Sequence, residues 1–353
     1  MNHAEILKKL LSEAVQQNAS DLHISVDRYP TLRVAGVLIP LDSEEVITEA
    51  SAQGLISELF TDGQKEKFLK DRQLDFAYSF TDNVRFRVST YFQQGFWAAS
   101  LRMVPAKVPT IEELGLPSIL HDFAKLTQGL ILMVGPAGHG KSTTTAAILD
   151  EISHTRAAHI ITVEDPIEYL FEQSKGIVSQ REVGSDVTSF AEGLRTILRE
   201  DPDVIMVGEM RDADSIATAM TAAETGHLVL STLHTNSASQ TVDRIIDSFP
   251  SEQQPQIVAQ VATTLVAIVS ERLVPAIKGG RVPALEIMVM NPAIRNLIRE
   301  KKIFSIDSVI QTGTSEGMKT LNQSLAQLVK DGVITAENAE LFSTNTEELK
   351  QML

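Results

Sequence analysis

The sequence contains no cysteine and no long apolar run. Its 353 residues therefore form neither disulfide bonds nor a cysteine-ligated zinc site. The longest apolar stretch, residues 257–269, is shorter than the roughly 20 residues that span a bilayer, and it includes Gln260. The first residues, 1–6, lack the basic and apolar regions of a signal peptide. We expect no integral membrane segment.

Positive charge is also scarce. The chain has 31 Lys and Arg against 46 Asp and Glu, and its formal net charge is −15. This balance disfavours attraction of the whole surface to nucleic acid or to anionic lipid, although a local basic ring stays open. A nucleic-acid translocase is therefore the most distant interpretation, and we expect no nucleic-acid partner. The length predicts two domains, each able to bury a core.

Residues 1–105 are predicted to form a small α+β domain. Apolar residues at helical spacing predict an amphipathic helix over 4–15, and a second helical segment is expected over 43–60. Prolines cluster after this domain, so residues 106–117 are expected to be a linker. The strand-like runs are 31–41, with Gly36 as a hairpin turn, 75–80, 85–92 and 97–104.

Residues 118–353 alternate between apolar runs and helical patterns. This alternation predicts an α/β domain in which helices cover both faces of a parallel sheet. The region from about 286 to 353 is expected to be helical. The buried strands are predicted at 130–134, 159–163, 204–207 and 228–232.

A phosphate-binding loop follows the first of these strands. Glycines let backbone N–H groups close around phosphates, Lys141 reaches the terminal phosphates, and the Ser142 hydroxyl can ligate Mg²⁺. The helix that follows adds a partial positive charge at its N-terminus. We therefore expect ATP with Mg²⁺ to bind to Gly135, Pro136, Ala137, Gly138, His139, Gly140, Lys141, Ser142 and Thr143.

Acidic residues end two further predicted strands. Glu209 stands at a carboxyl end, where open α/β sheets bind ligands, and is a candidate to hold Mg²⁺ or to orient water. A solvated helix cap is the alternative. Glu164 lies with Asp165 and Glu168 in a group of carboxylates that repel one another unless a cation or a proton is supplied. Glu164 is our candidate to polarise the attacking water, with a charged surface turn as the alternative.

Histidines and arginines complete the candidate set. His227 and His234 stand at the two ends of the predicted strand 228–232. Either can sense a γ-phosphate, but a histidine at a strand end is more often a structural hydrogen-bonding group. Arg87 and Arg102 lie on strands of the small domain. Their guanidinium groups either face solvent or provide positive charge to a γ-phosphate bound by another domain or subunit.

Taken together, these segments resemble the secretion ATPase superfamily and, within it, the type IV pilus retraction ATPase family of PilT and PilU. The resemblance covers nearly the whole chain. Besides the phosphate-binding loop, residues 163–168 resemble the family's acidic box, 198–212 its Walker B motif, and 221–235 its histidine box. The family's retraction signature is matched by Ala293, Ile294, Arg295, Asn296, Leu297, Ile298, Arg299 and Glu300.

The resemblance implies a PAS-like N-terminal domain and a RecA-like P-loop ATPase domain with a helical C-terminal portion. It implies a homo-hexameric motor that hydrolyses ATP to power pilus retraction and twitching motility. In that motor Glu164 is the catalytic carboxylate, and Glu209 is the Walker B carboxylate around Mg²⁺. His227 and His234 lie near the phosphates, and the N-terminal domain lends Arg87 and Arg102 to a nucleotide site of the ring.

The resemblance also implies a place and partners. We expect a cytoplasmic protein at the inner-membrane face of the pilus machine, acting on the pilus platform protein, with a sister pilus ATPase as a further candidate partner. The alternatives are an accessory nucleotide-binding ring with low turnover and an assembly or secretion ATPase of the same superfamily. The chain departs from the family at Ser89, where Asn is usual, and at His139, where Ser is usual. We expect the His139 imidazole to face solvent or another subunit.

Overall fold

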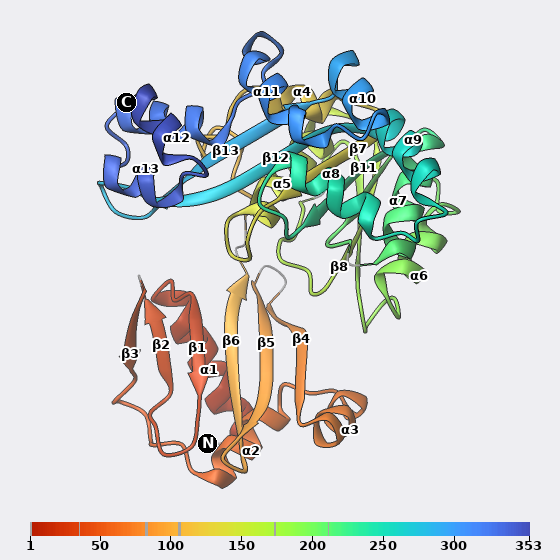
Figure 1. The fold of residues 1–353 in the computed structure, drawn as a ribbon. Helices are drawn as coiled ribbons and strands as arrows, with labels where there is room; N and C mark the ends of the chain where they lie inside the picture. The colour runs from red at the N-terminus through yellow and green to blue at the C-terminus, as the bar shows by residue number, and fades with distance from the viewer. Residues whose placement is uncertain (1, 35, 82–83, 105–106, 173, 211) are drawn as a thin grey trace. The chain divides into compact units, whose positions relative to one another are not determined.

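The computed structural model describes residues 2–34, 36–81, 84–104, 107–172, 174–210 and 212–353. The chain divides into two compact units (Figure 1): residues 1–107 together with 166–170, and residues 108–165 together with 171–353. The expected end of the first domain, at Pro105, and the expected start of the linker, at Ala106, lie outside the described residues. Each unit has its own sheet and its own hydrophobic core.

The first unit is built on an antiparallel sheet of six strands in the order β3-β2-β1-β6-β5-β4. Its strands are β1 (Asp21–Ile24), β2 (Thr31–Val34), β3 (Val37–Pro40), β4 (Gln73–Thr81), β5 (Val84–Gln93) and β6 (Phe96–Val104). Its helices are α1 (His3–Gln16), α2 (Glu49–Ser57) and α3 (Asp62–Asp71). The predicted strands and the first helix are confirmed. The second helix begins only at Glu49, because Thr48 caps it, and α3 was not predicted.

The core of the first unit lies on one face of its sheet. The apolar stripe of α1, which includes Leu7 and Leu11, packs there together with α2. In β5, Phe86 and Val88 point into this core, while the residues that alternate with them lie on the opposite face. That opposite face therefore carries the polar side chains of the strands.

The second unit is built on a sheet of seven strands in the order β13-β12-β7-β11-β10-β8-β9. All neighbouring pairs are parallel except β12 and β13, which are antiparallel. The four predicted strands are confirmed, and β9, β12 and β13 were not predicted. The strands are β7 (Gly129–Val134), β8 (His159–Glu164), β9 (Ile177–Glu182), β10 (Val204–Val207), β11 (Leu228–Leu233), β12 (Leu265–Pro275) and β13 (Arg281–Val289).

Helices cover both faces of this second sheet (Figure 1). In β7, Leu130 and Leu132 pack with the helices α6 to α10, whereas Ile131 and Met133 pack with α4 and α5 on the other face. The helices are α4 (Ile119–Lys125), α5 (Lys141–Thr155), α6 (Phe190–Ile197), α7 (Ala213–Glu224), α8 (Ala238–Asp247), α9 (Gln254–Thr264) and α10 (Pro292–Arg299). A sheet that is buried on both faces explains why its strands read as continuous apolar runs.

The C-terminal region forms a third, smaller core against β12 and β13. The helices of this core are α12 (Leu321–Lys330), α13 (Ala336–Phe342) and α14 (Thr346–Met352). The helix α11 (Ile306–Thr312) packs instead into the core that contains α8 and α10, and short 3₁₀ turns lie at Ile303–Ser305 and Thr314–Glu316. Because β13 runs to Val289, the helical region begins at Pro292, slightly later than expected. None of the described helices is long and apolar enough to cross a membrane. The expected α/β fold with a small N-terminal domain is confirmed.

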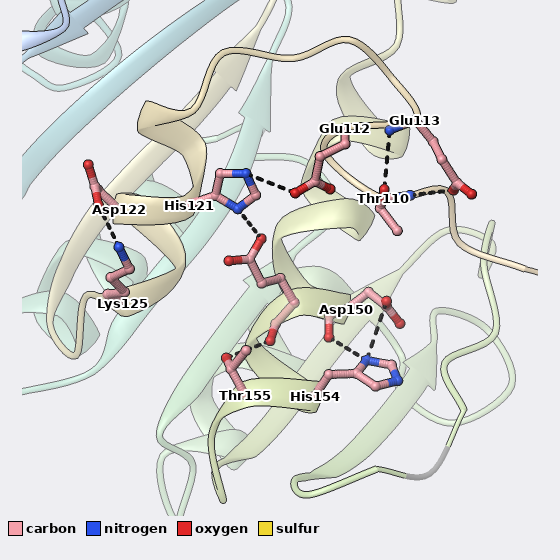
Figure 2. A network of polar contacts seen from close by, with 10 residues as sticks. Thr110, Glu112, Glu113, His121, Asp122, Lys125, Asp150, His154 and Thr155 are labelled. Atoms are coloured by element: carbon pink, nitrogen blue, oxygen red, sulfur yellow. Dashed lines mark hydrogen bonds and ion pairs between the residues drawn. The ribbon is translucent and has the colours of Figure 1, made fainter.

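A polar network joins α4 to α5 (Figure 2). His121 lies between two carboxylates, with its Nδ1 2.7 Å from Glu151 Oε2 and its Nε2 3.3 Å from Glu112 Oε1. Glu151 is on α5, and Glu112 is in the turn at residues 111–115, within the expected linker. The histidine therefore fastens this turn to the helix whose other end carries the phosphate-binding loop.

Candidate nucleotide site

The phosphate-binding loop joins β7, which is fully buried, to the N-terminus of α5. Gly135 and Gly140 have φ values of +143° and +96°, which favour glycine. Both residues also pack against Glu271 of β12. A Cβ added to Gly135 would lie 2.5 Å from the main-chain oxygen of Glu271, and one added to Gly140 would collide with its side chain. The glycines are thus required by close packing as well as by backbone conformation.

Lys141 is held over this loop. It is 7% exposed, and its Nζ donates to the carbonyl oxygens of Gly135 and Pro136 at 2.9 Å each. The same ammonium group lies 3.5 Å from Nδ1 of His234. The positive charge is therefore fixed at the loop by groups of the protein itself.

His234 connects Lys141 to Glu209. Its Nε2 lies 3.3 Å from Glu209 Oε1. If Nδ1 accepts from the ammonium group of Lys141, the ring proton is on Nε2, where it faces Glu209. Both Glu209 and His234 follow the carboxyl ends of parallel strands, β10 and β11, which pair with one another and so end at the same edge of the sheet. The structure therefore places His234 in contact with both Lys141 and Glu209.

Glu164 is the last residue of β8, at the same edge. It is 5% exposed, and its Oε1 accepts hydrogen bonds from Thr162 Oγ1 at 2.6 Å and from Gln180 Nε2 at 3.0 Å. The carboxyl group is buried and oriented, unlike that of a solvated surface turn. Such fixed orientation is what a carboxylate needs to position a water molecule.

His227 is not brought to the loop within one chain. It precedes β11 and therefore lies at the opposite edge of the sheet, six strand residues and roughly 20 Å from His234. Its Nδ1 lies 2.9 Å from Ala222 O and 3.2 Å from Thr225 Oγ1, at the end of α7. In a single subunit it has the structural hydrogen-bonding role that we considered for a histidine at a strand end.

His139 has a different environment from the one expected. Its Nδ1 accepts the backbone N–H of Leu273 on β12 at 3.0 Å, and the ring is partly buried. Burial, together with the nearby Arg272 and Arg281, lowers the pKa of His139. The imidazole is therefore neutral near pH 7 and fastens the loop to β12. The structure does not turn it to solvent.

The hairpin β12–β13 supports the loop at further points that were not predicted from the sequence. Arg281 Nη1 donates to Gly138 O at 3.3 Å, and Glu271 accepts from Thr144 of α5. The sequence does contain an indication of these contacts, because Glu271 and Arg272 interrupt an otherwise apolar stretch. Charged residues inside a buried strand point to a polar site nearby.

Arg87 and Arg102 are neighbours in the first unit. They face each other across β5 and β6, and Arg102 also pairs with Asp21 of β1. Arg102 Nε donates to Asp21 Oδ1 at 2.9 Å, and Arg87 Nη1 lies 3.6 Å from Glu168 Oε1. The Arg102 side chain is 69% exposed and the Arg87 side chain is 40% exposed. The two arginines thus share one face, because residues paired directly across strands lie on the same side of the sheet.

The signature segment forms α10 and its C-cap, Glu300. Ile294 and Ile298 are fully buried in the core that includes α9, and Leu297 packs at its margin. Arg295 Nη1 donates to Ala262 O, near the end of α9, at 2.9 Å. The segment is therefore tied to α9 both by packing and by a hydrogen bond.

The chain is similar to known proteins over most of its length. The model of the family described as "Type II/IV secretion system protein" matches residues 2–279. The type IV pilus retraction ATPase PilT of Pseudomonas aeruginosa is 45% identical over 94% of this chain and 96% of its own length. A twitching motility protein of Neisseria gonorrhoeae is 41% identical over 98% of this chain and 92% of its own. A crystal structure of the pilus retraction motor PilT with bound ADP matches with a TM-score of 0.91 and 44% identity, covering 98% of each chain.

Proposed function

Since the chain belongs to the type II/IV secretion system protein family, we propose that it is the ATP-hydrolysing motor that powers type IV pilus retraction. It is an ATPase of this family and binds nucleotide. The observation that carries the proposal is the contact series from Lys141 through His234 to Glu209, beside the phosphate-binding loop. Near-complete coverage of a pilus retraction ATPase supports the choice of motor.

The residues at the loop fit a nucleotide. A Cβ built on Gly138 has no neighbouring atom within 4 Å, so an anion can approach the loop backbone there. The residues that would hold the phosphates are the loop from Gly135 to Thr143 and the Lys141 ammonium group. Ser142 and Glu209 would hold Mg²⁺. ATP supplies the transferable phosphoryl group, and Mg²⁺ neutralises part of its charge.

The chain's own groups then have separate tasks. Lys141 brings positive charge to the phosphates, and Glu164 holds the attacking water in line because its carboxyl group is fixed by Thr162 and Gln180. His234 contacts both Glu209 and Lys141 and so fixes the position of one side chain relative to the other. Catalysis on this scheme depends on positioning and on charge, which is what phosphoryl transfer requires.

The ring and its partners extend the proposal. We place the protein in a homo-hexamer whose nucleotide sites receive charge from Arg87 and Arg102, both of which are exposed enough to reach a further anion. The hexamer acts at the cytoplasmic face of the inner membrane on the pilus platform protein, alongside a sister pilus ATPase where one is present. The signature helix α10, tied to α9, is the segment that we assign to motor action.

A deletion strain tests the proposal against its alternatives. A retraction motor predicts that deletion abolishes twitching while surface pili persist, and that the wild-type gene restores twitching but Glu209→Gln does not. Loss of pili on deletion would indicate an assembly ATPase instead. Restoration of twitching by Glu209→Gln would indicate an accessory ring. Glu252→Gln, an exposed glutamate of the same unit, is the matched control and should restore twitching.

A further inference from the structure

Glu271 lies directly under the phosphate-binding loop, in the middle of β12. It is 2% exposed, and its Oε2 accepts a hydrogen bond from Thr144 Oγ1, on the first turn of α5, at 2.9 Å. Its main-chain oxygen abuts Gly135, and its side chain abuts Gly140. One residue therefore touches both ends of the loop and the beginning of the helix that follows it.

The charged groups around Glu271 are committed to other partners. Lys141 Nζ donates to the loop carbonyls of Gly135 and Pro136, and Arg272 Nη2 donates to Asn236 O at 3.2 Å and Oδ1 at 3.0 Å. His139 is neutral where it accepts from Leu273. The hydrogen bond that the structure gives the Glu271 carboxyl group comes from the uncharged hydroxyl of Thr144.

This environment disfavours the ionised carboxyl group. Burial raises the pKa of Glu271 to about 7, against the opposing effects of the Thr144 hydrogen bond and the Lys141 charge. Phosphates bound on the other side of the loop would add negative charge a short distance away, in a region with little water. Like charges at such a distance favour the protonated form further.

We propose that Glu271 is a positioning residue of the nucleotide site, which fixes the loop through Thr144 and its two flanking glycines and takes up one proton from solvent when phosphates bind. This inference rests on the proposed nucleotide-binding function of the loop. The neutral carboxyl group supports the loop without repelling the phosphates, while the ionised group repels them. Nucleotide affinity should therefore fall as the pH rises through the pKa of Glu271 in the free protein.

Isothermal titration of the full chain with ADP and Mg²⁺ tests this inference, because titration in buffers with different protonation enthalpies counts the protons taken up. At pH 7.5 we expect the wild type to take up about half a proton or more, and its Kd to rise about tenfold between pH 6 and pH 8. Glu271→Gln keeps the size and a hydrogen-bond acceptor but cannot ionise, so it should show neither effect.

Glu286→Gln is the matched control. Glu286 is also buried, and its pKa is also raised to about 7 by burial, but its carboxyl group accepts from Ala238 N and does not contact the loop. We expect this variant to take up protons as the wild type does. Equal proton uptake by the wild type and Glu271→Gln would overturn the inference, while failure of the wild type itself to bind ADP would overturn the proposed function instead.

Thr144→Val provides a second test that keeps the carboxyl group, in case Glu271→Gln does not fold. The hydrogen bond from Thr144 lowers the pKa of Glu271, so its removal should raise that pKa and move the midpoint of the affinity change to higher pH. A merely structural role for Glu271 predicts weaker binding at every pH with the midpoint unchanged, and that result would contradict the inference.

Discussion

The two sheets of this protein differ in how far their charged side chains are exposed to solvent. In the second unit, three charged groups of the candidate nucleotide site are almost completely buried, with exposed fractions of 7% for Lys141, 5% for Glu164 and 2% for Glu271. In the first unit, Arg87 and Arg102 lie on the sheet face opposite the core, and their side chains are 40% and 69% exposed, respectively. The first arrangement fixes groups in advance of binding, and the second keeps cations available.

The cause is how each sheet is covered. Helices pack on both faces of the seven-stranded sheet, so carboxyl groups on its strands, such as those of Glu164 and Glu271, are buried and hydrogen-bonded within the protein. The six-stranded sheet has its core on one face, and its other face carries a cross-strand row of Arg33, Asp21, Arg102 and Arg87. Residues paired directly across strands lie on the same face. Asp21 is buried in this row and holds Arg102 while leaving Arg87 to Glu168.

The largest effect should come from removing the fixed cation of the second unit. Lys141→Ala deletes an ammonium group held at the loop, and we expect the kcat for ATP hydrolysis to fall about 10²- to 10³-fold. Steady-state hydrolysis at saturating ATP measures this. Lys278→Ala, an exposed lysine of the same unit, is the control. A kcat for Lys141→Ala equal to that of the control would show that the buried charge takes no part in the reaction.

The buried carboxyl groups should make the stability of the second unit depend on pH. Glu286 has a pKa of about 7 when folded against 4.5 as its ordinary value, so the folded chain retains a proton that the unfolded chain has released. Its contribution is therefore greatest below about pH 4.5 and is lost as the pH rises to about 7, a change on the order of 3 kcal/mol. Urea unfolding at pH 5 and pH 8 should show a smaller difference for Glu286→Gln than for the wild type. An equal difference in both proteins would refute this account.

Removing one arginine from the first unit should reduce ATP hydrolysis less than removing Lys141. Arg87→Ala should reduce the kcat for ATP hydrolysis by about tenfold, below the 10³-fold or more of a single arginine finger, because Arg102 still supplies charge. The affinity for ADP should change little. Arg33→Ala, from the same row, is the control for general loss of positive charge. If both variants hydrolyse ATP at the same rate, Arg87 has no specific role.

The smallest effect is expected at the network of Figure 2. His121→Ala removes both contacts of the imidazole, with Glu151 and with Glu112, and should destabilise the second unit by about 1 kcal/mol. Lys125→Ala, which breaks an exposed ion pair with Asp122, should cost less than this. Thermal unfolding of the two variants compares them. A larger loss for Lys125→Ala would contradict the importance of the histidine contacts.

The sequence predicted the elements that have strong local signals. The strands β7, β8, β10 and β11 are continuous apolar runs because both faces of their sheet are buried, and each was found. In contrast, β12 follows α9 without a break and contains the polar residues Ser270, Glu271 and Arg272. Because the helical and the strand pattern run into one another there, the apolar stretch 257–269 does not show where α9 ends and β12 begins.

The residues of the candidate site also divide into those that a local sequence pattern predicts and those that only the fold brings to the loop. Lys141 and Glu209 belong to motifs with fixed spacing, and their place at one sheet edge follows from the parallel strand order. Glu271 is 130 residues along the chain from Lys141, and it reaches the loop only because β12 pairs with β7. The position of His227 also depends on the fold, since strand direction decides which end of β11 meets the loop. Contacts of this kind require the sheet order, which local patterns do not contain.

ATP hydrolysis by the purified protein in the presence of Mg²⁺, compared with Glu209→Gln and with the exposed control Glu252→Gln, tests the central claim most directly. We predict sustained turnover for the wild type and for the control, with turnover lost in Glu209→Gln because the carboxylate beside His234 can no longer hold its charge. Tight ATP binding without turnover in all three proteins would contradict the claim that this chain is a motor.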